Sequence, residues 1–567
     1  MPSERGSRCQ GPASTGPEST GPESTGPEST EPFTRDLDQE DDPWDRAFRG
    51  ISPEIETVMR GTMRGEPESL GPVDASLLRE DHRLQLGIVR GVRYHDSIAN
   101  SPQLLALLEN PKIPKATREL WKRARNARLI MSNAVPDMPA TESGVHPYCI
   151  WHPHLAAEET YRELARRYPT MRYQVGRACA VAGYSALYAE LDLLPDVSIA
   201  EEARDSPRGG DIFKLIMGQP VLYSVMDDYT RSVHDDQPRA GAFLNGDTAV
   251  VSSLDNRLQP WCLNGALHIG WFDITEDLLI DTKLGDSRGT WWEQLDHVDL
   301  LYSPLPQHLP TTRKELLILM AAYEGNIDRY ARLCRPPAAR ASLAELLCIV
   351  RGIHHSTSFA KWMAVLLDSQ PDGPMAIRLR LDGGSVKRAI AARFIMANDL
   401  SRVSPGVPAD DFPYMIWYPL RPSEVTLRDL LRLQPTEMKT AIAHACIVCD
   451  YQSLFDEIDI EPDYILADEA RQSPNRHYLE HLQRRATEKS VILDRTHAYR
   501  PGPHSAYSDV TEPDKEPTFP SSLSDRIGPG PMFSGQPGGI FDGWQVTSRY
   551  IERFICASEE DRRRAKS

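Results

Sequence analysis

Four potential zinc ligands lie within nine residues of one another, and imidazole and thiolate are ligands that zinc prefers. They are His146, Cys149, His152 and His154. The chain carries a second copy of this segment, which tests the idea. The corresponding residues there are Phe412, Met415, Tyr418 and Leu420. None of these is a usual zinc ligand, whereas the aromatic residue Trp151 recurs as Trp417. We therefore expect an aromatic wedge packed between helices, and no metal ligands here.

A second group of residues could hold a divalent ion or supply an acid and a base. It consists of Asp227, Asp228, His234, Asp235 and Asp236. Carboxylates with a nearby histidine are also typical of a solvated acidic loop, and Arg231 and Arg239 flank this one. The loop is the favoured interpretation. The alternative function is a metal-dependent or hydrolytic enzyme whose site lies in residues 227–236.

For the remaining reactive residues the sequence also favours a structural role over a catalytic one. Cys446 and Cys449 form a CxxC pair, but in the other copy they correspond to Cys179 and Ala182, so we expect small core residues on a helix. His354 and His355 follow Gly352, which we interpret as a turn, and are expected to be capping or surface residues. No phosphate-cradling loop or nucleophile elbow is present in the sequence. The sequence thus predicts no catalytic residue, no bound metal and no cofactor.

A block of the sequence occurs twice, and its two copies contain several of the residues considered above. The segment HPYCIWHPHLAAEETYRELARRYPT, which starts at His146, recurs as FPYMIWYPLRPSEVTLRDLLRLQPT, which starts at Phe412. The correspondence extends over residues 127–207 and 392–474. Duplicated helical blocks of this kind are typical of arrays in which each unit buries its apolar face against the next.

A shorter pattern recurs in and between the two copies, in which small residues precede a glycine by three and four positions. It is clearest in AAYEGNIDRYARL from Ala321 and recurs in ALHIGWFDITEDLL from Ala266 and around Gly183. Small residues allow two antiparallel helices to approach closely, and glycine permits the turn that ends the first helix. The predicted units are therefore helix pairs.

These residues resemble the ankyrin family, although the Thr-Pro-Leu-His opening is absent and Asp450 replaces Gly183 in the second copy. The chain is most similar to the divergent ankyrin-repeat-like proteins of filamentous fungi. The resemblance implies a non-catalytic protein-interaction scaffold. It also implies a transcription coregulator associated with a secondary-metabolite gene cluster, with a transcription factor as the candidate partner.

The expected fold is an all-α, ankyrin-like helical-repeat solenoid with disordered ends. We expect a low-complexity acidic tail over 1–50, a helical lead-in over 51–99 and the repeat array over 100–490, with an irregular insertion at about 208–258. A mostly disordered Pro- and Gly-rich tail over 491–567 would contain one short helix at 544–556.

Composition narrows the expected partners. The formal net charge of −17 argues against a phosphate-backbone binder, so we expect another protein and no direct nucleic acid. The sequence has no apolar run long enough for a membrane span, and we expect no small-molecule substrate. Nine scattered cysteines indicate an intracellular protein, cytoplasmic or nuclear. Candidate interface anchors are Trp271, Trp291 and Trp292.

Overall fold

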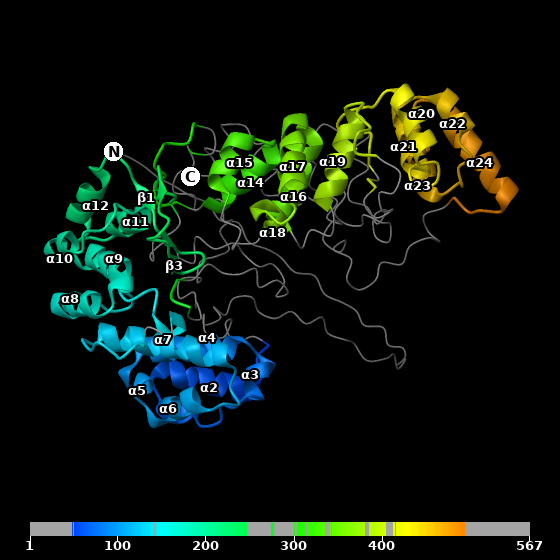
Figure 1. Ribbon diagram of the computed structural model, residues 1–567. Helices are drawn as coiled ribbons and strands as arrows, with labels where there is room; N and C mark the ends of the chain where they lie inside the picture. Colours follow the sequence, from blue (N-terminus) through cyan, green and yellow to red (C-terminus); the bar gives the residue numbers. More distant parts are fainter. Residues whose placement is uncertain are drawn as a thin grey trace, which may run out of the picture.

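The molecule is built mainly from helices, as a computed structural model shows (Figure 1). The structure describes residues 48, 50–139, 143–246, 274–276, 300, 303–312, 314–334, 341, 343–379, 385–403, 412–413 and 415–493. The expectation of an all-α fold is confirmed at this level. Most of both predicted tails, the short helix at 544–556 and the end of the predicted insertion, 247–258, lie outside the described residues.

The first group of helices surrounds the buried side chains of Met59, Ile88 and Trp121. Its elements are α2 (Pro53–Arg64), η1 (Pro67–Leu70), α3 (Leu77–Glu80), α4 (Arg83–Tyr94), α5 (Asp96–Ala99), α6 (Pro102–Glu109) and α7 (Lys115–Met131). Helix α4 packs against both α2 and α7. Ser101 caps α6 by accepting a hydrogen bond from the Leu104 amide, and Leu104 and Leu108 face the core.

A second group follows, with two antiparallel strand pairs attached to it, one nested inside the other, which we call the hairpins. Its elements are η2 (Ser143–Val145), α8 (Glu158–Arg167), η3 (Pro169–Met171), α9 (Arg172–Ala182), α10 (Ser185–Glu190), α11 (Val197–Asp205) and α12 (Gly210–Met217). Strands β1 (Tyr223–Ser224) and β4 (Arg239–Ala240) pair antiparallel, as do β2 (Met226–Asp227) and β3 (Ser232–Val233). The irregular insertion therefore begins after α12, later than the sequence predicted.

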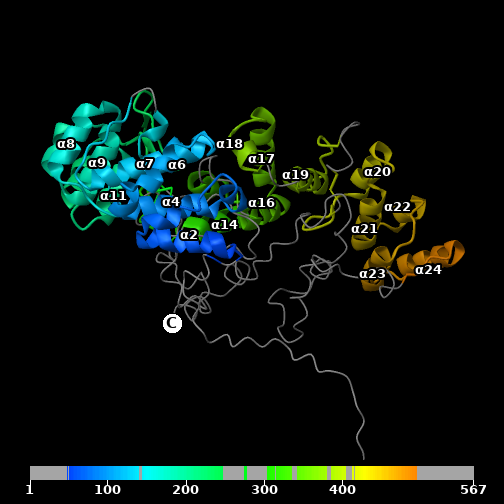
Figure 2. The same ribbon diagram turned by 90° about the horizontal axis from the view of Figure 1, so that it is seen from below.

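The third and fourth groups complete the described chain. The third contains α14 (Lys314–Glu324), α15 (Ile327–Leu333), α16 (Leu343–His355), α17 (Thr357–Ser369), α18 (Pro374–Arg378) and α19 (Ser385–Met396). The fourth contains α20 (Glu424–Leu433), α21 (Lys439–Cys449), α22 (Gln452–Glu457), α23 (Tyr464–Gln472) and α24 (His477–Lys489). Both views place α20–α24 at the opposite end of the molecule from α8–α12 (Figures 1 and 2).

The helices of the fourth group match those of the second in order and length. Helices α8 and α20 have 10 residues each, α9 and α21 have 11, α10 and α22 have 6, and α11 and α23 have 9. Each helix of the fourth group starts 266 or 267 residues after its counterpart in the second group. Helix α24 follows α12 at the same offset, so the match continues beyond the block that was recognisable in the sequence.

The N-termini of α8 and α20 are each fixed by an asparagine side chain, and the two asparagines occupy equivalent positions. Asn133 has a positive φ of 65°, and its side-chain oxygen accepts hydrogen bonds from the Ala157 amide and the Thr160 hydroxyl. In the second copy Asn398 has φ 61°. Its side-chain oxygen accepts from the Ser423 amide and the Thr426 hydroxyl. The two blocks thus share tertiary contacts as well as sequence.

The correspondence also reaches upstream, into helices whose sequences show little similarity. Tyr94, at the end of α4, donates to or accepts from Nε2 of His152 at 3.0 Å, and the two rings meet edge to face. At the equivalent place His355, at the end of α16, meets the ring of Tyr418 edge to face, with centroids 5.5 Å apart. The tyrosine and the histidine have exchanged places between the copies.

The glycines act in two different ways. Gly183 and Gly325 have positive φ and lie where α9 and α14 end, as the sequence predicted. The interpretation of Gly352 as a turn is wrong: it lies inside α16, where a Cβ would overlap the Ala322 carbonyl oxygen of α14. Gly352 therefore serves close helix packing.

Asp450 replaces the capping glycine at the end of α21 and adopts the same left-handed conformation, with φ 59°. Its carboxylate accepts hydrogen bonds from the side-chain Nδ2 of Asn475 and from the Tyr478 hydroxyl of α24. The cap of one helix is in this way tied to another helix.

Candidate functional site

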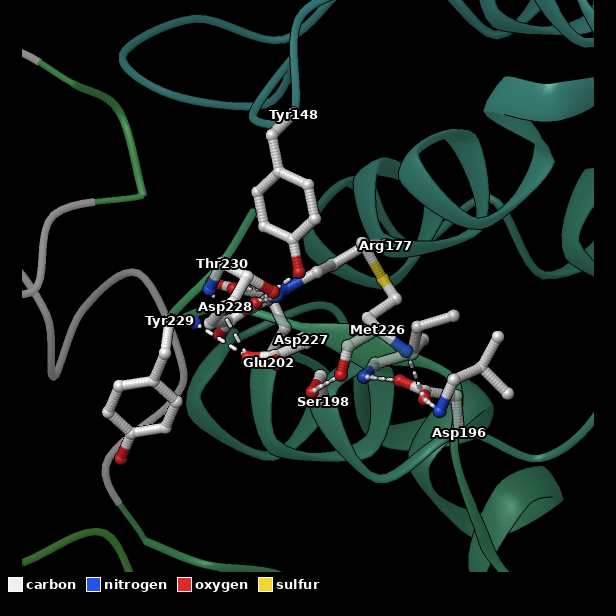
Figure 3. Close-up of polar contacts among 12 residues, drawn as sticks. Tyr148, Arg177, Asp196, Ser198, Glu202, Met226, Asp227, Asp228, Tyr229 and Thr230 are labelled. Carbon is white, nitrogen blue, oxygen red and sulfur yellow. Dashed lines mark hydrogen bonds and ion pairs between the residues drawn. The ribbon is translucent and has the colours of Figure 1, made fainter. Parts of the chain in front are cut away.

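A buried ion cluster lies between α9, α11 and the β2–β3 turn (Figure 3). Arg177 of α9 donates from Nε to Glu202 of α11 at 2.8 Å. The two terminal nitrogens of the same guanidinium donate to the two carboxylate oxygens of Asp228. All three side chains are almost completely shielded from solvent. This fork-to-fork geometry is the strongest form of arginine–carboxylate contact.

Tyr148 closes the cluster by donating its hydroxyl hydrogen to Asp228 (Figure 3). Burial, reinforced by the charge of Asp228, raises the pKa of Tyr148 well above its ordinary value, so the phenol stays protonated. Burial alone would lower the pKa of Arg177, but the charges of Asp228 and Glu202 outweigh it and raise that pKa. Tyr148 and Arg177 therefore both stay protonated, with a permanently charged guanidinium at the centre of the cluster.

A second buried carboxylate fixes the hairpins against the helices. Asp196 caps α11 by accepting from the Ile199 amide, and its other oxygen accepts from the Val225 and Met226 amides (Figure 3). Burial raises its pKa despite these three hydrogen bonds. Asp196 thus joins the start of a helix to the start of a strand, which places Asp228 above Arg177.

The second copy contains a reduced version of the same cluster. His444 occupies the position of Arg177 on α21, and its Nδ1 lies 3.7 Å from the carboxylate of Glu469 on α23. In the first copy Arg177 lies over the ring of Trp151, and in the second His444 stacks on Trp417 with centroids 5.2 Å apart. The prediction that both tryptophans pack in the interior is confirmed, since each is almost fully buried.

The structure disperses the five residues of the predicted acidic site. Asp228 belongs to the buried cluster, and Asp227 accepts from the backbone amides of the turn that follows it. His234 contacts the Ser232 hydroxyl at the surface, while Asp235 and Asp236 are exposed. The buried member is saturated by Arg177 and Tyr148, so these residues do not converge on one pocket as an acid–base pair would require.

The four residues of the rejected zinc site have separate neighbours. His146 packs against Tyr168 and His152 against Tyr94, while the ring of His154 contacts Arg128. The fourth, Cys149, is buried, and its carbonyl oxygen accepts from Arg93. Burial raises the pKa of the Cys149 thiol, which disfavours the thiolate that zinc needs.

The other reactive residues are also structural. Burial raises the pKa of Cys449 to about 11 and that of Cys446 further, so neither thiol is poised for redox exchange. The expectation is wrong for His354, which is buried, whereas His355 is half-buried in the last turn of α16 and packs on Tyr418. The candidate anchors Trp271, Trp291 and Trp292 lie outside the described residues.

Sequence reasoning missed three exposed apolar side chains on α20 and in the loop before it, which we call the α20 face and define as Leu420, Val425 and Leu433. Val425 is 69% exposed, and Leu420 and Leu433 are 41% exposed each. At the equivalent positions the first copy carries His154, Glu159 and Arg167, all of them exposed. Comparing the copies for outward-facing differences would have revealed it, but the sequence alone does not say which side of the helix faces outward.

Among the described residues, no helix is long and apolar enough to cross a membrane. A family model described as the YKP1 C-terminal domain matches residues 151–257. No curated protein and no solved structure matches this sequence. The segment that is similar to the YKP1 C-terminal domain runs from Trp151 through α8–α12 and both hairpins, and it contains Arg177, Glu202 and Asp228.

Proposed function

We propose that this chain is a non-catalytic scaffold that binds another protein through the α20 face. The observation that carries the proposal is the contrast between the copies: Val425 and Leu433 are exposed where Glu159 and Arg167 stand on α8. Helices α8 and α20 have the same length and begin on the same kind of asparagine contact, so the fold does not require apolar residues on the outer face.

Burial energetics support this assignment. Removing apolar surface from water contributes about 25 cal/mol per Å², so covering the Val425 and Leu433 side chains would contribute on the order of 1–2 kcal/mol each. Leu420 adds a third exposed apolar side chain in the loop before α20. Charged residues of the same helix flank Val425 and Leu433, because Arg428 pairs with Glu424 and Arg432 pairs with Asp429. Apolar anchors among charged side chains are common in protein interfaces.

We further propose that the helices form an ankyrin-like solenoid. The recurrence of helix order and the paired contacts of Asn133 and Asn398 support stacked, equivalent units. Solenoids present successive units along one extended surface, which suits protein recognition. The net charge of −17 favours a basic partner. A transcription factor fits that charge, and the proposed role is that of a transcription coregulator in the cytoplasm or nucleus, in keeping with the fungal ankyrin-like resemblance.

The test combines a change on α20 with a matched change on α8. The variant Val425→Glu with Leu433→Arg gives the α20 face the charges of the first copy. Proteins retained by the tagged full-length chain are identified by mass spectrometry, and each is purified and titrated against the wild type. We expect the double variant to bind its direct partner at least about tenfold more weakly, which is about 1.4 kcal/mol.

The control variant carries Glu159→Gln with Arg167→Gln at the matching positions of α8. It should bind the partner as tightly as the wild type does, and circular dichroism should show both variants to be folded. Equal partner affinity for the wild type and the α20 variant would contradict the proposal.

A further inference from the structure

We infer that Asp456, His477 and His481 form a binding site for a divalent transition metal of the zinc type. Asp456 lies in the last turn of α22, and the two histidines lie one turn apart at the start of α24. Their ligand atoms all lie within 4.8 Å of one another. Two imidazoles spaced i, i+4 on one helix with a carboxylate from a second element make a donor set that zinc accepts.

The distances fit a small cation. Nδ1 of His481 lies 3.6 Å from the Asp456 carboxylate oxygen, and Nε2 of His477 lies 2.6 Å from the same oxygen. Ligand atoms about 2.0–2.1 Å from a tetrahedral zinc are about 3.3 Å apart. His477 and Asp456 must therefore separate by less than about 1 Å, and the hydrogen between them moves to the other ring nitrogen or to solvent. Asp456 is exposed, so a metal ion can enter from water.

The duplication argues that these three residues are not needed for packing. Their counterparts in the first copy are Ala189, Gly210 and Lys214, none of which can ligate zinc in this way. Both copies nevertheless place the same helices at these positions. The same comparison of copies argued against a zinc site at His146 to His154, because the aromatic residues there recur and the ligands do not. Here it shows that Asp456, His477 and His481 occur together in the second copy alone.

His481 carries an additional cost that packing does not explain. Its ring contacts Phe455 edge to face, with centroids 5.4 Å apart, and its Nε2 is buried with no hydrogen-bond partner among the described residues. Leaving a buried polar atom unsatisfied costs about 1–3 kcal/mol. A metal on Nδ1 does not remove that cost, because Nε2 is the other ring nitrogen. An apolar side chain would fill the same space against Phe455 without it, so packing alone does not account for an imidazole that presents Nδ1 to Asp456.

Nearby charged side chains influence the affinity of this site for a metal ion. Arg484 contacts Nδ1 of His481 at 3.4 Å and must turn away when a metal binds. The next two cations are already neutralised, because Arg485 pairs with Asp459 and Lys489 pairs with Glu461. Arg484 is therefore the one nearby cation of this described helix that competes directly with the metal.

The test uses the full chain, stripped with a chelator and titrated with Co²⁺ followed by visible absorption, and with Zn²⁺ followed by calorimetry. We expect one strong site in the wild type. Since outer-shell changes alone cost roughly 10–100-fold, His477→Ala and His481→Ala should each weaken binding by about 100-fold or more. Arg484→Ala should strengthen binding. Zn²⁺ should raise the melting temperature of the wild type but not that of His477→Ala.

His82→Ala provides the control, because His82 is an exposed histidine beside a carboxylate at the other end of the chain. It should leave Co²⁺ binding unchanged. The inference fails if the wild type shows no one-to-one site, or if the His477 and His481 variants bind as the wild type does while remaining folded by circular dichroism. Neither outcome depends on the α20 face.

Discussion

At the scale of single residues, the contact between Arg177 and Asp228 determines how the acidic loop behaves. The sequence places Asp228 among other carboxylates, and that neighbourhood suggested a surface loop or an ion site. The decisive partner is 51 residues away on α9. Neither charge type nor local spacing predicts such a pairing, because it depends on how Asp196 holds the hairpin against α11.

Removing the central cation should destabilise the fold strongly. Arg177→Ala would leave Glu202 and Asp228 buried without a counterion, and breaking a buried pair in this way costs about 3–5 kcal/mol. The free energy of unfolding, measured by urea denaturation followed by circular dichroism, should fall by that amount. If the loss is no larger than that of a surface arginine, the cluster is not the buried unit described above.

The matched comparison for this experiment is Arg162→Ala. Arg162 also contacts several carboxylates, those of Glu158, Glu159 and Glu190, but does so at the surface. Exposed ion pairs contribute little to stability, so its denaturation midpoint should stay close to that of the wild type.

At the scale of elements, close helix packing depends on glycines inside helices. Gly352 of α16 lies against the backbone of Ala322 in α14, and Gly91 of α4 lies in the same way against Thr62 in α2. The small-residue pattern in the sequence predicted close helix pairs correctly at Gly183 and Gly325. It could not separate a glycine that ends a helix from one that a neighbouring helix touches, since both need the absence of Cβ.

A methyl group at this contact should force the helices apart. Gly352→Ala would overlap the Ala322 carbonyl oxygen, and overpacking of this kind costs about 1–3 kcal/mol despite the better helix propensity of alanine. Thermal unfolding should show a lower melting temperature. The control is Gly210→Ala on α12, where a Cβ meets no atom within 4 Å and the melting temperature should not fall. Equal effects of the two substitutions would argue against a close contact between α14 and α16.

At the scale of the whole molecule, the correspondence between the halves extends from α4 and α16 to α12 and α24. The sequence predicted the helical class and the block at 127–207 and 392–474. It missed the upstream part because the contact there is kept with the residues exchanged, Tyr94 with His152 in one half and His355 with Tyr418 in the other. Exchanging the tyrosine and the histidine preserves the packing of the two rings but leaves no sequence identity at either position.

Three buried or half-buried histidines, from both halves, should make the free energy of unfolding depend on pH. Burial is the main cause that lowers the pKa of His152 and His355 to about 3 and that of His354 to about 4. Their unfolded value is near 6.5, so the unfolded state binds protons first as the pH falls below 6.5. The stability present above that pH should therefore decline between about pH 6.5 and pH 3, by up to roughly 1.4 kcal/mol per pH unit for each histidine.

Urea denaturation at pH 8, 7, 6 and 5 measures this slope. The double variant His152→Gln with His355→Gln should show a shallower decline between pH 6 and pH 5 than the wild type. His82→Gln, at an exposed position, should keep the wild-type slope. An unchanged slope in the double variant would mean that these imidazoles are protonated in the folded protein.

Asp450 couples the stability of α21 to that of α24. A left-handed conformation costs a non-glycine residue about 1–2 kcal/mol, and the hydrogen bonds from Asn475 and from Tyr478 of α24 offset that cost only while α24 is in place. Departure of α24 would leave the end of α21 strained, and fraying of α21 would withdraw an acceptor from α24. The two helices should consequently open and close as a single cooperative unit, with similar amide-exchange protection.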